Sequence, residues 1–441
     1  MESNPQTKKK LKLRERVLAH VVEHQERSFA VPIIITVLLI AILVGYSIWN
    51  RKSVTSYKVN TTAHSQSQDD ETRITFTGDI VLGRNVKKRA EEVGYDRLFQ
   101  KMQNVWKTSD CVMANLDTCV VDDVDAAEHT KSKDVLFYTD RSNLKYLKDA
   151  GIDVLSIATG HIADFGRSSV RNAVEELDAL GIKHVGAGEN REKAAEYTIV
   201  EVNNTDGSTV KVAIFGALGH QDEKFGAKAQ RVANTEIDPN TPKTWEQILA
   251  EQNASDTAVS DTAASDQAEF DPWQETAGVF SGRNQLLAEN INNVRAQVDA
   301  VIVYMHWGDD KMFYETEDMR ELAHIYIDAG ADLVIGTNPR VLLPVEVYES
   351  RVKTGLIFYS IGSLVYDDAE TRVCDSISLD LVIDAAKNKR VEITPLRVNS
   401  AIPEETDGLY SKRIFASLTK RLDKDRYKCE NNKLIISFDS N

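Results

Sequence analysis

The chain has 441 residues, enough for one large domain or two of ordinary size, and its hydrophobic content of 42% and charged content of 27% are ordinary for a globular protein. The net charge of −15 is distributed unevenly: residues 1–52 hold nine Lys and Arg against four Glu, so the remainder is strongly acidic. An acidic body excludes a broad nucleic-acid surface, because such a surface needs Lys and Arg to neutralise phosphates, and we expect no nucleic-acid partner.

The first predicted element is a membrane helix over residues 29–49. This segment has no charged side chain in 21 positions, a length that spans the hydrocarbon layer of about 30 Å. A cleaved signal peptide and a buried core helix are the alternatives, but the apolar run is long for either. Seven Lys and Arg lie in the basic leader, residues 1–28, so the positive-inside rule places the N-terminus in the cytoplasm. The sequence predicts a single-pass protein of the cell membrane with an extracellular C-terminal domain.

Residues 50–71 are polar and predict a flexible stalk, and a domain over residues 72–400 follows. In this domain short apolar runs alternate with helical patterns, which predicts an α/β fold with much parallel pairing. The predicted strands are 73–78, 111–116, 153–158, 211–218, 300–307, 332–336 and 355–361, and the predicted helices are 142–150, 168–180, 190–196, 280–297 and 316–329. We expect 211–217 and 379–398 to be antiparallel additions.

Two further segments differ in composition from the rest. Residues about 250–270 consist largely of Ala, Ser, Asp and Thr, which predicts a mobile insert. Residues 401–441 combine a helical pattern with a last apolar strand, and we expect them to pack on the domain as a C-terminal extension. The cysteine count is even, which permits disulfides, but no C-x-x-C supports a zinc ribbon; the cysteines are Cys111, Cys119, Cys374 and Cys429.

Potential ligands stand at the ends of four predicted strands: Asp79; Asn115 and Asp117; His161, with Asp164 three residues on; and His306. Strand ends gather at the carboxyl edge of an open α/β sheet, so we expect these side chains to converge. Carboxylate, amide oxygen and imidazole together form a ligand set for divalent metals. Each residue has a structural alternative, because an aspartate can cap a helix or turn and a lone histidine is commonly a hydrogen-bonded core residue.

Six motifs occur in the order seen in one known family: ITFTGDIVLGR, ANLDT, GIDVLSIATGHIADFG, VDAVIVYMHWG, GADLVIGTNPRVLLPVE and FYSIGSLVYD. Over about residues 72–370 the chain resembles the CapA family of poly-γ-glutamate capsule synthesis proteins. The resemblance implies a calcineurin-like metallophosphatase-type fold, a layered α/β/β/α sandwich. It also implies a part in capsule synthesis and export, with the membrane, the other subunits of the polymer-synthesis complex and the anionic polymer as partners.

The resemblance extends to the candidate site. It implies a metal site, weak or vestigial, at Asp79, Asn115, Asp117 and His306, and we expect His161 and Asp164 to be the catalytic residues. One motif departs from the family pattern, because the family's Gly-His-His-Pro-His is Gly-Thr-Asn-Pro-Arg at residues 336–340 of this chain. Every histidine of that motif is therefore lost.

Arg340 places a fixed positive charge where the family has a histidine. A cation about 4 Å from a metal ion opposes it by about 4 kcal/mol at an effective dielectric constant of about 20. We expect one divalent metal at most (Mn, Fe, Zn or Mg), weakly bound or absent, and Asp79 or Asp117 paired with Arg340. Alternatively Arg340, with Asn338 and Trp307, binds substrate, because a guanidinium can form two parallel hydrogen bonds with a carboxylate or a phosphate. Trp307 could instead simply pack in the core.

Two functions remain open from these residues. The changed turn favours an accessory protein of capsule synthesis without strong catalysis. The retained strand-end ligands favour an active metal-dependent hydrolase, acting on a phosphoester or an amide at the cell surface.

Overall fold

The computed structural model describes residues 71–122, 135–219, 278–281 and 285–438. The predicted leader, transmembrane helix and insert, and all of the stalk before residue 71, lie outside these residues. Within the described segments no helix is long and apolar enough to cross a bilayer. The four cysteines fall in described segments and are present as thiols rather than disulfides.

The larger of the two main sheets has ten strands, and β1 (Thr72–Ile80) divides it. On one side β1 pairs in parallel with β2, and on the other it pairs antiparallel with β16. The strand order is β19-β20-β17-β16-β1-β2-β5-β6, with β15 on β1 and β18 on β17. The remaining bounds are β2 Cys111–Leu116, β5 Val154–Ser156, β6 Lys183–Val185, β15 Ser363–Val365, β16 Asp375–Ile383, β17 Lys389–Asn399, β18 Ile402–Glu405, β19 Tyr427–Glu430 and β20 Lys433–Ser437.

The smaller main sheet has six strands in the order β13-β14-β12-β11-β9-β8. Its bounds are β8 Thr198–Asn203, β9 Thr209–Leu218, β11 Ala300–His306, β12 Leu333–Thr337, β13 Val345–Glu349 and β14 Thr354–Phe358. The prediction that 211–217 is an antiparallel addition is wrong on one edge, because β9 pairs in parallel with β11 and antiparallel only with β8. A connection that includes α11 separates β9 from β11, which allows the parallel crossover. The antiparallel expectation for 379–398 is confirmed by β16 and β17.

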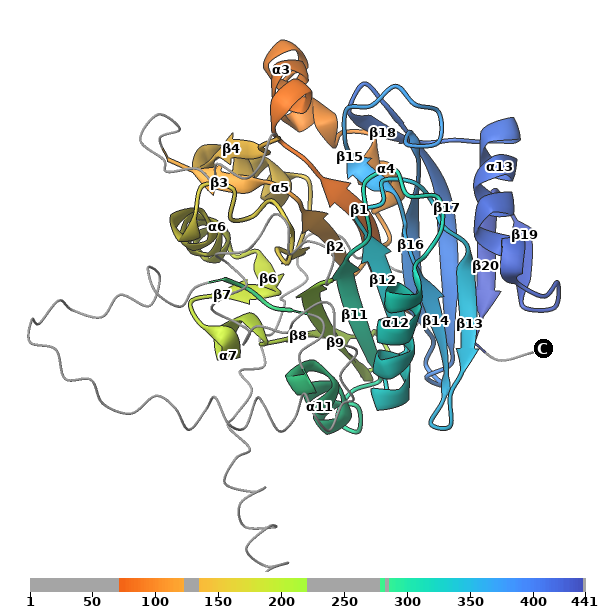
Figure 1. Ribbon diagram of the computed structural model, residues 1–441. Coiled ribbons are helices and arrows are strands. Elements are labelled where there is room, and N and C mark those ends of the chain that lie inside the picture. The colour runs from red at the N-terminus through yellow and green to blue at the C-terminus, as the bar shows by residue number, and fades with distance from the viewer. Residues whose placement is uncertain (1–70, 123–134, 220–277, 282–284, 439–441) are drawn as a thin grey trace, which may run out of the picture. The chain divides into compact units, whose positions relative to one another are not determined.

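The two main sheets pack face to face, and helices cover their outer faces (Figure 1), whereas α13 packs into the core between the sheets. One core contains Phe76 and Leu379 from the larger sheet together with Val212 and Ile302 from the smaller sheet. Two further cores lie between each sheet and its helices. The helices are α3 Arg84–Val93, α4 Met102–Val105, α5 Lys145–Asp149, α6 Arg167–Leu180, α7 Arg191–Ala194, α11 Gln285–Val294, α12 Glu317–Ala329 and α13 Gly408–Leu418. The predicted α/β fold with layered sheets and helices is confirmed.

Local sequence signals explain where the long helices begin and end. The Thr316 hydroxyl accepts the N–H of Met319 and caps α12, and Gly330 ends this helix at a φ of 120°. Gly181 ends α6 in the left-handed region at a φ of 67°. Two pairs of short strands were not predicted from the sequence. They are β3 (Cys119–Val121) with β4 (Tyr138–Asp140), and β7 (Ala187–Gly188) with β10 (Gly278–Val279).

Candidate functional site

The predicted strand-end residues converge at the carboxyl ends of both main sheets. Asp79 on β1 lies opposite Asn115 on β2, and His306, the last residue of β11, lies opposite Thr337, the last residue of β12. Asp117 follows β2 directly. The side chains are almost wholly buried, with 0 to 1% of their surface exposed. Parallel pairing within each sheet and face-to-face packing between the sheets therefore create one polar cluster in an apolar interior.

Asn115 links Asp79 to His306. The Asn115 amide nitrogen donates to Asp79 Oδ1 at 2.6 Å and lies 3.1 Å from His306 Nδ1. The same Nδ1 lies 3.3 Å from Thr337 Oγ1 and 3.6 Å from Asp79 Oδ1. His306 Nε2 lies 3.7 Å from Asp117 Oδ1, so the imidazole sits between the two aspartates.

Arg340 reaches this cluster from the turn after β12 and pairs with both aspartates. Its Nη1 lies 2.9 Å from Asp79 Oδ2, and its Nη2 donates to Asp117 Oδ2. Only 3% of the arginine side chain is exposed. One guanidinium therefore forms ion pairs with two buried carboxylates at once.

The charges of this trio shift one another's pKa values. Burial by itself would raise the pKa of Asp79 and of Asp117. Arg340 and His306, joined by His161 at Asp117, together outweigh burial and hold both pKa values below the ordinary carboxyl range. Burial would lower the pKa of Arg340, whereas Asp79 and Asp117 raise it above its ordinary value. All three groups are therefore ionised at neutral pH.

The turn that carries Arg340 has a strained backbone. Asn338 has a φ of 88° and Arg340 a φ of 61°, in the left-handed region that side chains other than glycine rarely adopt. The Asn338 N–H donates to Asp79 Oδ2 at 3.0 Å, and its side-chain amide donates to the Gly308 carbonyl. Strained residues persist where their surroundings fix them, and they concentrate at functional sites. This turn is held in place by the same aspartate that Arg340 neutralises.

His161 and Asp164, the predicted catalytic pair, lie at the mouth of the cluster. His161 Nδ1 is 2.7 Å from Asp164 Oδ2, and the same carboxylate oxygen accepts the Phe137 N–H at 3.0 Å. The side chain of His161 is 20% exposed, whereas that of Asp164 is fully buried. Asp164 thus orients the imidazole, and the nitrogen opposite it is the one that a ligand could contact.

Two aromatic rings complete the mouth. The Phe137 ring centroid is 4.1 Å from that of His161 and 5.9 Å from the guanidinium carbon of Arg340. That carbon is also 4.7 Å from the Tyr366 ring centroid. Sequence reasoning missed both aromatic residues, although Tyr366 lies within the motif FYSIGSLVYD. Phe137 belongs to none of the six motifs, so the sequence did not indicate its place at the site.

The other two proposed substrate-binding residues are used within the fold. Trp307 is 2% exposed, its ring stacks on Tyr359, and its N–H donates to the Tyr359 carbonyl at 2.9 Å. The amide of Asn338 is bound to Gly308, as described above. Their predicted contact with substrate remains a prediction that this arrangement does not support.

The donor set fits a divalent metal poorly in this arrangement. An ion bound to Asp79 and Asp117 would share both carboxylates with a guanidinium, which opposes it electrostatically. In the part of the chain that the structure describes, no group of three His, Cys, Asp or Glu side chains is placed to hold a metal ion.

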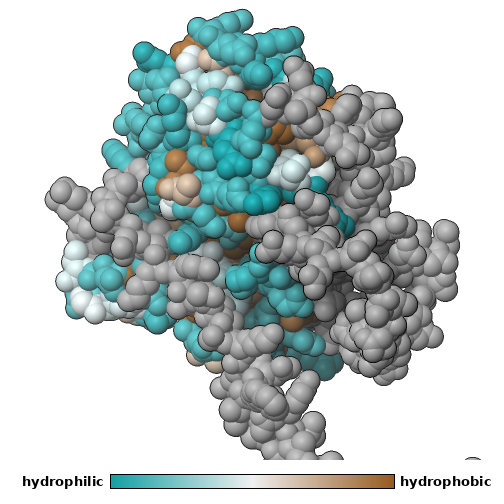
Figure 2. Space-filling view, turned by 90° about the vertical axis from the view of Figure 1, so that its left-hand side faces the viewer, coloured by the Kyte–Doolittle hydropathy of each residue, from teal (hydrophilic) through white to brown (hydrophobic). Residues whose placement is uncertain are grey.

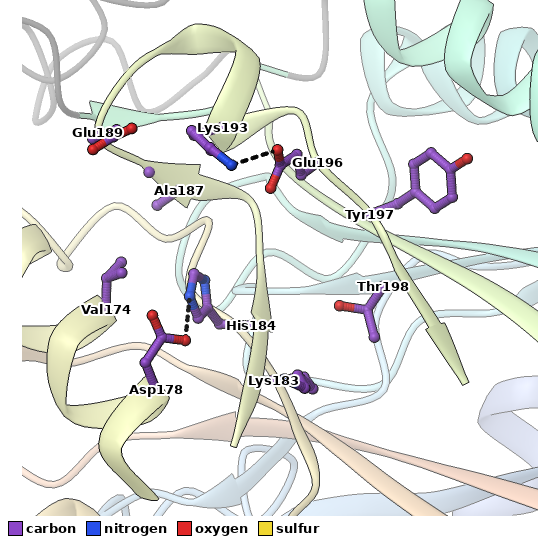
Figure 3. A pocket seen from close by; sticks show the side chains of 11 residues that line it. Val174, Asp178, Lys183, His184, Ala187, Glu189, Lys193, Glu196, Tyr197 and Thr198 are labelled. Carbon is purple, nitrogen blue, oxygen red and sulfur yellow. Dashed lines mark hydrogen bonds and ion pairs between the residues drawn. The ribbon is translucent and has the colours of Figure 1, made fainter. Parts of the chain in front are cut away.

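A separate cavity of about 230 Å³ lies between α6, β6, β7, α7 and the start of β8 (Figure 3). His184 Nε2 lies 3.6 Å from Asp178 Oδ1 beside it, and Lys193 forms an ion pair with Glu196 at 2.9 Å. Charges of both signs line it, and it holds none of the predicted site residues. Figure 2 shows the left-hand side of the view in Figure 1, where the coloured surface is mainly hydrophilic.

Comparison with known proteins matches residues 73–368 to the family model described as bacterial capsule synthesis protein PGA_cap. The PGA biosynthesis protein CapA of Bacillus subtilis (strain 168) is 27% identical, with 98% of each chain covered. The capsule biosynthesis protein CapA of Bacillus anthracis is 24% identical over 95% of this chain and 88% of that protein. A probable polyglutamine synthesis accessory protein of Mycobacterium tuberculosis is 23% identical over 68% of this chain and 75% of that protein. TT1561 of Thermus thermophilus, a solved structure, covers 73% of this chain with a TM-score of 0.31, which is too low to bear on the fold.

Proposed function

This chain belongs to the bacterial capsule synthesis protein family PGA_cap, and we propose that it is a membrane-anchored accessory protein of poly-γ-glutamate or related capsule synthesis and export, without hydrolytic activity of its own. Two relatives named for PGA or capsule biosynthesis align over nearly the whole chain, and a third is named a synthesis accessory protein. The two facing sheets with polar residues at their carboxyl ends support a distant relation to metallophosphatases as part of this proposal.

The apolar segment 29–49 supports the proposed location. It would anchor the protein with its N-terminus in the cytoplasm and its body outside, beside the other membrane subunits of a polymer-synthesis complex. Protease added to intact cells without their wall should digest the body and spare the leader. A body that is digested only after the membrane is lysed would contradict this orientation.

The observation that carries the non-catalytic assignment is the double ion pair of Arg340 with Asp79 and Asp117. A metal-dependent hydrolase needs an open coordination position and a bound water of lowered pKa. Here a permanent cation takes the carboxylates that would bind the ion, and strained backbone at Asn338 and Arg340 keeps that cation in place. We infer that the ion pairs replace a metal centre and stabilise the strand ends.

The second candidate function is an active metal-dependent hydrolase at the cell surface. The observation that favours it is the retained set of Asp79, Asn115, Asp117 and His306, beside a hydrogen-bonded His161 and Asp164. If Arg340 moved away, carboxylate, amide and imidazole donors would remain for one ion of Mn, Fe, Zn or Mg.

Metal content distinguishes the two functions. We expect the full chain, purified in detergent, to retain substoichiometric transition metal after gel filtration and to show negligible phosphoester turnover with added manganese. The triple substitution T337H/N338H/R340H should raise metal affinity, because it adds imidazole donors and removes the guanidinium charge. T337H/N338H, which keeps Arg340, is the matched control and should gain much less. One or more equivalents of manganese, iron or zinc on the unsubstituted chain would instead establish the second function.

A further inference from the structure

We propose that the first turns of α3, through Arg84 and Lys87 with Lys88 beside them, form a docking surface for the carboxylates of an acidic polypeptide at the mouth of the Asp79–Arg340–Asp117 cluster. The choice of poly-γ-glutamate as that polypeptide rests on the proposed function. The carboxylate chemistry rests on the residues themselves.

The charged side chains of α3 are arranged opposite to the order that its helix dipole favours. A helix carries partial positive charge at its N-terminus, so acidic side chains normally favour the first turn and basic ones the last. In α3 the first turns carry Arg84, Lys87 and Lys88 and no acid, while Glu91 and Glu92 lie near its end. No side chain caps the N-terminus at Gly83. Positive charge and N–H groups are therefore concentrated at one end of a helix in a protein of net charge −15.

Two aromatic rings lie within cation–π distance of these cations. The guanidinium carbon of Arg84 is 5.7 Å from the Phe137 ring centroid, and Lys87 Nζ is 5.7 Å from the Tyr138 ring centroid. Among the residues that the structure describes, no carboxylate forms an ion pair with Arg84. Its φ of 53° is a further left-handed value near the candidate site. The Arg84 fork is thus pre-positioned and available for a carboxylate.

One aromatic ring connects the docking surface with the buried cluster. Phe137, which supports Arg84, also contacts the His161 ring and the guanidinium of Arg340. Arg340 Nε is buried there without a hydrogen bond in the described structure, 3.6 Å from the half-exposed Asp310. An acidic chain bound at Arg84 would therefore lie near His161, because both side chains contact Phe137.

An anionic membrane surface is the competing partner for a basic helix. Membrane-surface helices insert an apolar face, but the apolar Val86 and Ala90 of α3 are buried within the protein. The exposed large hydrophobic side chains of the described residues include none from α3. The observations therefore favour a hydrophilic acidic polymer over lipid.

The test is binding of a fluorescently labelled oligo-γ-glutamate to the full chain in detergent, followed by anisotropy at low salt. R84A/K87A should weaken binding about tenfold or more, since charge-assisted hydrogen bonds are lost, and should reduce its dependence on salt. The charge-preserving exchange R84K/K87R should retain most of the affinity. K412A/K420A removes two charges from exposed positions on and just after α13, and should leave binding nearly unchanged.

Several outcomes would overturn the proposal. Equal weakening by K412A/K420A would mean that net charge alone governs binding. Inorganic polyphosphate that displaces the oligomer more effectively than unlabelled oligo-γ-glutamate would show a phosphate site, and binding only to phosphatidylserine vesicles would show a membrane surface. No binding by the unsubstituted chain would reject the surface outright. Metal analysis of the same sample tests the proposed function independently, so the two failures can be told apart.

Discussion

An arginine with acidic partners lies at each end of β1, and the two clusters are built differently. At the N-terminal end, Arg73 Nη1 lies 3.0 Å from Asp380 Oδ2 and 2.9 Å from Glu392 Oε2. These acids face each other on neighbouring antiparallel strands, β16 and β17. Regular strand pairing brings this cluster together, and 15% of the arginine side chain remains exposed.

At the C-terminal end, the arginine comes from a turn of the other sheet. Arg340 is more deeply buried than Arg73 and depends on two residues with left-handed backbone. Cross-strand pairs of opposite charge stabilise a sheet and require no strain. A cluster that needs strained turns and residues from both sheets is typical of a site retained for function. The difference supports a structural role for Arg73 and a functional origin for the Arg340 cluster.

The largest expected effect is that of R340M. The substitution keeps much of the side-chain volume but leaves Asp79 and Asp117 buried together without a cation. We expect a loss of about 3–5 kcal/mol in the free energy of unfolding. Urea denaturation followed by tryptophan fluorescence measures it, because Trp106 and Trp307 are both buried. Adding D117N to R340M should recover part of the loss; an R340M protein as stable as the unsubstituted chain would remove the distinction between the two ends of β1.

R73M should have a smaller effect. Glu392 keeps Arg390 at 2.8 Å and Lys433 at 3.2 Å, so removing Arg73 leaves no wholly uncompensated carboxylate. We expect a loss of about 1.5–3 kcal/mol, the range for a hydrogen bond to a charged group. The same denaturation measurement applies, and a loss that exceeds that of R340M would reverse the comparison.

The smallest expected effect concerns acid stability at the N-terminal end of β1. Burial would raise the pKa of Glu392, but Arg73 and Lys433 bring it down to about 2. A carboxyl whose pKa is lower in the folded state contributes stability above its unfolded value of about 4.3, and that contribution is lost as the pH falls toward 2. E392Q should therefore lose stability less steeply than the unsubstituted chain in this interval. If the urea midpoints of E392Q and of the unsubstituted chain fell by the same amount from pH 5 to 2, Glu392 would not be the cause of the acid sensitivity.

Much of the fold could be predicted from the sequence, because buried strands and amphipathic helices leave local patterns. The runs that became β1, β2, β11 and β12 were recognised, and α6 and α12 were placed to within a residue. The convergence of Asp79, Asn115, Asp117 and His306 followed from their common position at strand ends. The pairing of Arg340 with an aspartate was expected, but its bond to both was not.

The remaining features depend on tertiary contacts that leave no local pattern. The contact of Phe137 with Arg84 and His161 joins three separate segments, so no spacing in the sequence indicates it. The burial of Trp307 against Tyr359 likewise depends on how α12 packs on the smaller sheet. The parallel partner of β9 follows a long connection, and the apolar run alone does not specify orientation.

The pairing of β1 with β16 also determines when the protein can finish folding. Thr72 pairs with Ile383, so the first strand of the described body must wait for one of the last to be synthesised. Until then one edge of β1 exposes N–H and C=O groups that could pair with another chain. Contacts of such long sequence separation also slow folding, because the chain loses loop-closure entropy before these contacts can stabilise it. A chain that emerges N-terminus first therefore has to keep β1 from aggregating until most of the body has emerged.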